Sequence, residues 1–184
     1  MKKTLLLLVA VFAFGFTQAQ EFKGGIKGGL NLSSVDTEGT SGRTGFHAGL
    51  YFDAGMAGFN IMPEILFSTK GAEADNGGGE LNLSYVEIPI LFKKGFAKVL
   101  NVHLGPQFGL LLGAEDQDGT DIKEFYKGTD LSGVIGAGVD LPGGISGGLR
   151  YVLGLTDIND VAGATESVKN RTIQVYIGYK LFGN

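Results

Sequence analysis

Four charged residues, Lys27, Glu64, Glu87 and Arg150, have the types and the spacing to interact inside a folded structure. Each lies in a segment where polar and apolar residues alternate, and each belongs to the polar set of its segment. Counted from the ends of the segments, all four lie near the middle. Glu64 and Glu87 fall on consecutive segments, where two carboxylates repel unless a cation lies between them. We therefore predict that Arg150, through its bidentate guanidinium, and Lys27 neutralise both carboxylates. A proton- or ion-conducting relay is the alternative interpretation.

The residues around two other candidate sites, a histidine-based catalytic site and a calcium loop, do not fit those functions. His47 and His103 belong to segments that are not consecutive, and no Ser and Asp stand beside them to complete a triad, so interior hydrogen bonding is expected. The acidic run Asp116–Asp121 is similar to a calcium loop, but the first and last loop positions would fall on Ala114 and Phe125, which carry no carboxylate. The sequence thus predicts no catalytic, cofactor-binding or metal-ligating residue, and it predicts that the protein is not an enzyme.

The charged residues lie on a backbone that the alternation predicts to be extended. Strict alternation of apolar and polar residues is typical of a β-strand, and no segment shows a comparable helical period. In the last segment, for example, Ile173, Val175 and Ile177 alternate with polar or small residues. The pattern predicts eight strands, at Phe22–Ser33, Thr44–Ala54, Phe59–Lys70, Leu81–Lys93, Val99–Leu112, Leu131–Leu141, Ile145–Leu155 and Arg171–Phe182.

The connections between these strands alternate in length. Short turns are predicted at Gly55–Gly58, Lys94–Lys98 and Pro142–Gly144, and longer polar loops at Ser34–Arg43, Gly71–Glu80, Ala114–Asp130 and Thr156–Asn170. Short turns at one end and longer loops at the other are typical of a transmembrane barrel with both termini in the periplasm. In a bilayer the sheet must close, because an open edge leaves backbone groups unpaired in lipid. The expected fold is all-β, an eight-stranded antiparallel up-and-down transmembrane β-barrel.

Side-chain volume predicts which face of the barrel points outward. Alternation alone is equally compatible with a soluble barrel, whose apolar face is inside. Here the apolar set is bulky, whereas the polar set is rich in Gly, Ser and Asn, which suit the narrow lumen of an eight-stranded barrel. We therefore expect a lumen largely filled by small and charged side chains. Aromatic residues also sort toward the two ends, as interfacial girdles do: Phe22, Phe52, Phe59, Phe92, Phe96 and Tyr179 at the turns, Phe46 and Phe67 at the loops.

The first residues predict export. Lys2 and Lys3 precede the apolar run Leu5–Phe16, and Thr17–Ala19 supplies the small residues that a signal peptidase needs. We expect a signal peptide at residues 1–19 and an outer-membrane β-barrel domain at residues 20–184. The 184 residues include no cysteine, which excludes lipid attachment, disulfides and thiolate metal sites. The net charge of -4 indicates no excess of basic residues, so nucleic acid is not expected as a partner.

Several segments resemble one known family. Pro63–Gly71 and Tyr85–Lys93 together resemble the paired Glu/Pro strands of the PorT-like outer-membrane β-barrel family of Bacteroidetes. Gly147–Ile158 and Asn170–Phe182 are similar to that family's last two strands. The resemblance covers essentially the whole of residues 20–184. It implies an eight-stranded, porin-like barrel in the cell outer membrane and implies little about activity.

These observations predict an integral outer-membrane protein with a structural or interaction role through its extracellular loops. The alternative is a narrow porin-like channel for ions or small solutes, although eight-stranded barrels are normally filled by their own side chains. The expected partners are outer-membrane lipids and lipopolysaccharide, the barrel-assembly machinery during insertion, and an envelope or secretion-system protein. No cofactor is predicted.

Overall fold

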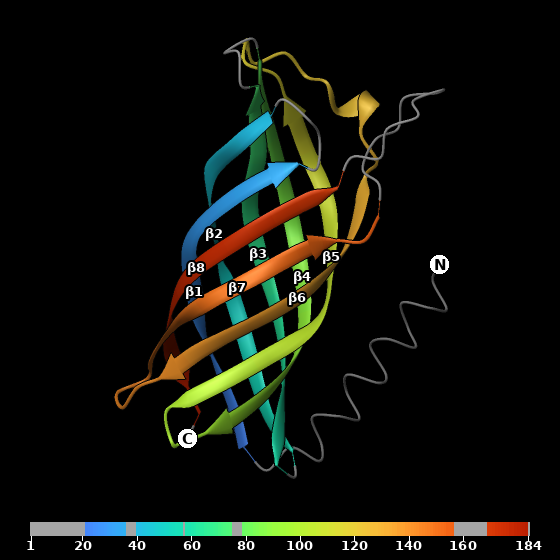
Figure 1. Ribbon diagram of the computed structural model, residues 1–184. Coiled ribbons are helices and arrows are strands. Elements are labelled where there is room, and N and C mark those ends of the chain that lie inside the picture. Colours follow the sequence, from blue (N-terminus) through green and yellow to red (C-terminus); the bar gives the residue numbers. More distant parts are fainter. Residues whose placement is uncertain (1–20, 36–39, 57, 75–78, 157–168, 184) are drawn as a thin grey trace, which may run out of the picture.

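The computed structural model describes residues 21–35, 40–56, 58–74, 79–156 and 169–183. Within them the chain forms eight antiparallel strands in a closed barrel, each paired with the next along the chain and the last paired with the first (Figure 1). The strands are β1 (Glu21–Val35), β2 (Thr40–Met56), β3 (Phe59–Ala74), β4 (Glu80–Phe96), β5 (Leu100–Glu115), β6 (Thr129–Asp140), β7 (Ile145–Gly154) and β8 (Asn170–Phe182). The predicted fold class is confirmed. The predicted signal peptide lies outside the described residues.

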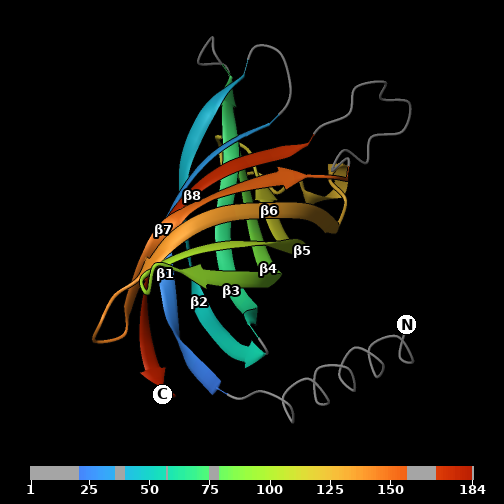
Figure 2. The same cartoon turned by 60° about the horizontal axis from the view of Figure 1, so that its bottom comes forward.

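The barrel has two different ends. Strands β2 and β3, β4 and β5, and β6 and β7 are joined by tight connections at the end where β1 begins and β8 finishes, here called the turn end. The connection before β7 turns through Gly143 and Gly144, whose φ angles of 87° and 86° favour glycine. The opposite end, here called the loop end, carries the short helix η1 (Lys123–Phe125). Figure 2 brings the turn end forward.

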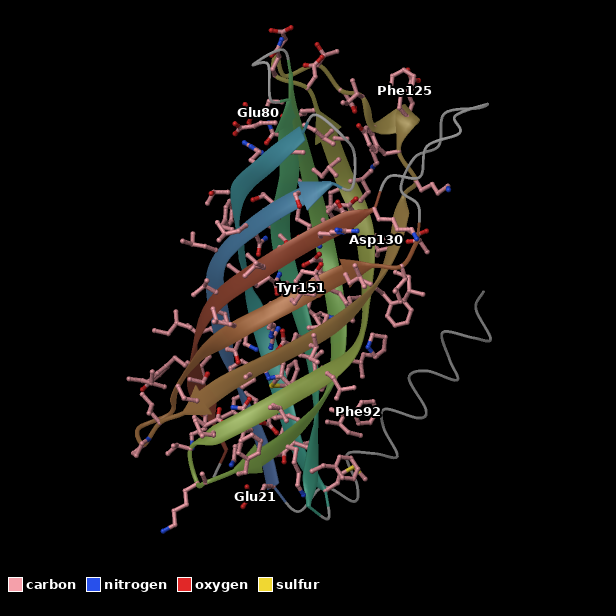
Figure 3. The ribbon with its side chains drawn as sticks, viewed as in Figure 1. Glu21, Glu80, Phe92, Phe125, Asp130 and Tyr151 are labelled. Carbon is pink, nitrogen blue, oxygen red and sulfur yellow. The ribbon has the colours of Figure 1, made fainter. Side chains whose placement is uncertain are left out.

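Over most of its length, each strand has its apolar face outward, as predicted. On β8, Ile173, Val175 and Ile177 are 44–64% exposed, whereas Gln174, on the opposite face, is fully buried. Aromatic rings gather at the turn end, where Phe22 packs against Phe52 and Phe182 with centroid distances of 6.1 and 5.9 Å. Figure 3 shows Phe92 projecting from the outer surface toward that end. No helix in the described part of the chain is long and apolar enough to cross a membrane.

Two of the predicted loops are largely strand. Strand pairing continues to Val35 and Thr40 in the first hairpin, and to Ala74 and Glu80 in the second. Residues 34–35, 40–43, 71–74 and 80 were therefore wrongly expected to lie in loops; residues 36–39 and 75–78 lie outside the described part of the chain. Their outward residues are polar, so the apolar alternation that identifies the rest of each strand stops before the hydrogen-bonded ladder does.

The lumen is not filled by small and charged residues alone. Tyr51, Met62, Leu91, Val134 and Val152 form a buried cluster on the inward face. Large apolar side chains fill a narrow barrel interior as effectively as polar ones, and they surround the charged residues with a medium of low polarity. The ion pairs that Glu64 and Glu87 form, described below, are therefore shielded from water.

Candidate functional site

Three of the four predicted network residues meet in the lumen. Arg150 donates two hydrogen bonds to Glu64, from Nη1 to Oε2 at 2.7 Å and from Nη2 to Oε1 at 2.8 Å. Lys27 forms a second ion pair with Glu64 Oε1. The three side chains are at most 2% exposed. Strands β1, β3 and β7 thus contribute to one cluster that crosses the barrel interior, here called the floor cluster (Lys27, Glu64 and Arg150).

Aromatic and imidazole rings hold the floor cluster in place. The Tyr176 ring lies beneath both cations, 4.5 Å from Lys27 Nζ and 4.6 Å from Arg150 Cζ. Arg150 Nε donates to His103 Nε2 at 3.0 Å, which leaves the His103 proton on Nδ1, where it is donated to Asn101 Oδ1 at 3.1 Å. Both predicted interior histidines are buried and hydrogen-bonded, because His47 Nδ1 also donates to an amide oxygen, at 2.8 Å.

Small residues make room for this cluster. A Cβ atom on Gly136 would lie 2.5 Å from His103 Nε2 and 2.9 Å from Arg150 Cγ. Both distances are shorter than real Cβ contacts allow, so an alanine there would displace the histidine or the arginine. Gly136 pairs with Arg150 across the β6–β7 ladder. The glycine is needed at this point because the arginine leans over it to reach β3.

The fourth predicted residue has different partners. Glu87 forms an ion pair with Lys70 and accepts a hydrogen bond from Gln107 Nε2 at 2.9 Å. The expected neutralisation of Glu87 by Arg150 and Lys27 is therefore wrong. The physical reason is the sheared register: on the β3–β4 ladder Glu87 pairs with Leu66, two residues nearer the loop end than Glu64. Glu64 and Glu87 therefore belong to two separate ion-pair layers rather than to one network.

A third charged cluster lies at the turn end, here called the mouth cluster (Asp53, Lys93 and Asp140). Lys93 Nζ is 3.0 Å from Asp53 Oδ2 and 2.9 Å from Asp140 Oδ2. Asn101 Nδ2 also donates to Asp140 Oδ2, at 2.8 Å. A cavity of about 370 Å³ is lined by all three residues of the mouth cluster and, from the floor cluster, by Lys27. The alternation within single strands does not predict that Asp53, Lys93 and Asp140 meet.

At the loop end strand β4 reverses its polarity. Leu83, Tyr85 and Leu111 point inward and are at most 5% exposed, while Ser84 and Asn82, on the outward face, are polar. Ile122 and Tyr126, on either side of η1, pack against these inward residues. Burial there raises the pKa of the Tyr126 hydroxyl. At this end the inward residues of β4 therefore form an apolar interior patch with Leu111, and the 116–128 connection packs against that patch.

The acidic run in that connection forms turns. Asp116 Oδ1 accepts the backbone N–H groups of Asp118 and Thr120, both at 2.9 Å, and Asp121 Oδ1 accepts that of Lys123 at 2.9 Å. These carboxylates cap the backbone of their own loop. Among the described residues no group of three or more His, Cys, Asp or Glu side chains could hold a metal ion.

An apolar outer face around a closed sheet, with buried charges inside, defines a transmembrane β-barrel of the outer-membrane type. The comparisons agree. A family model described as the outer membrane protein beta-barrel domain matches residues 18–160, and the chain belongs to that family.

Solved structures support the fold. Neisserial surface protein A is 13% identical, with a TM-score of 0.55 over 87% of this chain and 97% of its own. Ail, the attachment invasion locus protein of Yersinia pestis, is 16% identical, with a TM-score of 0.55 over 88% of this chain and 100% of its own. That Ail structure is a complex with the heparin analogue sucrose octasulfate. No curated protein matches the chain.

Proposed function

We propose that this protein binds a macromolecular partner at its loop end, and that the membrane-spanning part of the barrel is a closed anchor. The observation that carries the proposal is the reversal of polarity at the loop end. Leu83, Leu111 and Ala114 are at most 5% exposed, and Ile122 and Tyr126 pack against them. A barrel that only spanned the membrane would not need a second apolar interior beyond its apolar band. This interior holds the 116–128 connection as an ordered surface.

The charge of that surface favours a basic partner. Residues 115–130 carry six carboxylates and two lysines. Figure 3 shows Phe125 at the loop end, and its side chain is 47% exposed beside these charges. Acidic side chains around an exposed aromatic ring suit a protein surface rich in Arg and Lys. The same charges would repel a sulfated sugar of the kind that Ail binds.

The rest of the proposal concerns topology. We place the loop end outside the cell and the turn end in the periplasm, because long loops face outward in outer-membrane barrels. Residues 1–19 are then a signal peptide that is removed before insertion, and residues 20–184 are the mature barrel. Lipopolysaccharide surrounds the outward face, and the barrel-assembly machinery inserts the chain. Within the family, the motifs Pro63–Gly71 and Tyr85–Lys93 support the PorT-like branch.

The lumen supports an anchor rather than a conduit. The floor cluster crosses the interior, and the Lys70–Glu87 pair forms a second barrier, with both side chains 1% exposed. A narrow porin-like channel is the second candidate. It is favoured by the cavity at the turn end and by buried polar atoms for which the described residues offer no hydrogen-bond partner, among them Gln107 Oε1 and Gln174 Oε1. Such atoms are places where water can bind inside the barrel.

Site-specific crosslinking tests the proposal. A photoreactive amino acid at Phe125 reports on the loop end, and the same amino acid at Ala97, in the exposed turn between β4 and β5, is the matched control. In intact cells we expect a discrete protein adduct from position 125 and none from position 97. Reversal of the charges at Asp118 and Asp121 to lysine should remove the adduct. No adduct at 125, or an adduct that survives charge reversal, would contradict a basic partner at this end.

Planar bilayers distinguish the channel. The refolded barrel should give no steady unitary conductance steps, because the two ion-pair layers close the lumen. Steady steps in the unmodified protein would favour the second candidate. Glu64→Gln and Glu73→Gln, a buried and an exposed substitution on the same strand, then identify the barrier: only the buried change should alter the step size.

A further inference from the structure

The cavity at the turn end has the size and the lining of a site for a small molecule. Its volume of about 370 Å³ falls within the range of small-molecule pockets, and its lining includes residues of the β4–β5 and β6–β7 turns. Tyr51, Met62 and Tyr176 form part of its wall. Aromatic and apolar walls suit the body of an organic ligand, and the charged groups around them determine which ligand fits.

The charged groups of this lining are mainly cations. Its two carboxylates, Asp53 and Asp140, are outnumbered by lysines. The lysines are Lys23, Lys27, Lys93, Lys98 and Lys180. Lys93 pairs with both aspartates, and Lys23 pairs with Glu21, which does not line the cavity. Among the described residues no carboxylate pairs with Lys98 or Lys180, so the outer rim of the cavity keeps a positive excess even when Glu21 is counted.

The inner end of the cavity is also positive. In the floor cluster two cations, Lys27 and Arg150, share the single carboxylate of Glu64. All three side chains are at most 2% exposed, so water does not solvate the additional positive charge, and a buried charge without a counter-ion is costly. The rings of Tyr51 and Tyr176, 5.3 and 4.5 Å from Lys27 Nζ, stabilise that cation only in part.

The other carboxylates of the lumen do not supply the missing negative charge. Glu87 forms its own pair with Lys70 in the layer nearer the loop end. Asp53 and Asp140 share Lys93, and the further lysines of the rim outweigh the one carboxylate that this cluster has in excess. Both ends of the cavity therefore attract negative charge, and neither attracts a cation.

We propose that this cavity binds a small organic anion, a carboxylate with an apolar body, whose carboxylate points toward Lys27. An ammonium group has three N–H bonds, and Lys27 donates one of them to Glu64 Oε1. Tyr51 and Met62 provide the wall for the apolar body. The lysines of the rim favour the entry of anions over neutral molecules and cations. The site lies at the opposite end from the partner-binding surface and does not depend on it.

Three small molecules test the charge and the apolar body separately. Benzoate has both, acetate has the charge without the ring, and benzamide has the ring without the charge. The refolded barrel in nonionic detergent micelles is titrated with each while its amide resonances are followed. We expect benzoate to shift the amides of Tyr51, Asn101 and Tyr176 saturably. Acetate and benzamide should each bind at least about fivefold more weakly, a loss of roughly 1 kcal/mol.

A substitution at each end of the cavity tests the role of the lysines. Lys27→Met should weaken benzoate about fivefold and leave benzamide unchanged. Arg150 remains paired with Glu64 in this variant, so we expect the barrel to fold. Lys180→Met, at the rim, should weaken benzoate about twofold and tests the proposal even where Lys27→Met fails to fold. Lys94→Met is the matched control, because Lys94 is exposed at the same end but does not line the cavity.

Removal of a carboxylate should have the opposite effect. Asp140→Asn increases the positive excess of the lining, and we expect it to tighten benzoate about twofold. The proposal is overturned if benzoate gives no saturable shifts, if benzamide or acetate binds as tightly as benzoate, or if Lys180→Met changes the affinity no more than Lys94→Met does. Weaker binding of benzoate by Asp140→Asn would also overturn it.

Discussion

Glu64 is the residue on which the central ion pairs converge, because it is the shared counter-ion of Lys27 and Arg150. Glu64→Gln leaves two buried cations without a carboxylate. We expect the free energy of unfolding to fall by about 3–5 kcal/mol, as it does when one partner of a buried pair is removed. Equilibrium unfolding in urea, with the barrel in lipid vesicles, measures the loss.

Two further variants show whether charge is the cause. Glu115→Gln, an exposed substitution near the end of β5, should change the unfolding free energy by less than about 1 kcal/mol. Replacement of the whole cluster by apolar residues, Lys27→Met, Glu64→Leu and Arg150→Met together, should recover most of the stability. A triple variant as unstable as Glu64→Gln would mean that the loss comes from shape rather than from an unpaired charge.

At the residue scale the sequence predicts which side chains enter the lumen but not which of them meet. The side-chain period of two places Lys27, Glu64, Glu87 and Arg150 inside, and all four are buried there. Contact inside a barrel also depends on height, which the stagger between strands determines. That stagger brings Lys70 rather than Arg150 to Glu87. The alternation within a single strand contains no information about the stagger between strands.

At the element scale the important feature is the length of β3 and β4. They span 16 and 17 residues, whereas about 9–11 suffice to cross the hydrocarbon. On β4 the additional residues at the loop end have the reversed pattern, with Leu83 inside and Ser84 outside. A search for apolar alternation of one sense predicts a loop there. A search for alternation of either sense would have identified this end of β4.

The connection held by this extension gives the second prediction. Ile122 is half-buried and packs against the inward cluster at Leu83 and Tyr85. Ile122→Asn removes that packing, so residues 116–128 should open more often and be cleaved roughly fivefold faster by an added protease. The rate of cleavage, followed by mass spectrometry on the refolded barrel, measures the effect.

The barrel itself should survive this change. The heat-dependent shift of gel mobility that reports a folded barrel should be the same in Ile122→Asn as in the unmodified protein, because the strands do not depend on the connection. Phe125→Asn, in the same connection but 47% exposed, should leave the cleavage rate unchanged. Equal acceleration by both substitutions would contradict a specific packing role for Ile122.

At the scale of the whole molecule, the sequence predicts the fold because one rule applies to all eight strands. Lipid contact requires bulky apolar residues on the outer face of each strand, and closure leaves no edge that could differ from the rest. The structures at the two ends of the barrel do not follow from this alternation. The mouth cluster and the polarity-reversed extension depend on which strands are neighbours at a given height, so they become visible only in the closed sheet.

The third prediction tests the membrane itself as the solvent of the outer face. Ile177 is 64% exposed and pairs with Gly28 in the middle of the β1–β8 ladder. In a bilayer Ile177→Arg should destabilise the barrel by about 2–4 kcal/mol, the cost of arginine near the midplane. Thr44→Arg, also outward but polar and nearer the loop end, should cost about 0–1 kcal/mol. Both are measured by reversible unfolding from vesicles. If the two substitutions cost the same, the apolar face is not in contact with acyl chains at mid-height. If water rather than lipid surrounded the barrel, both substitutions would be tolerated.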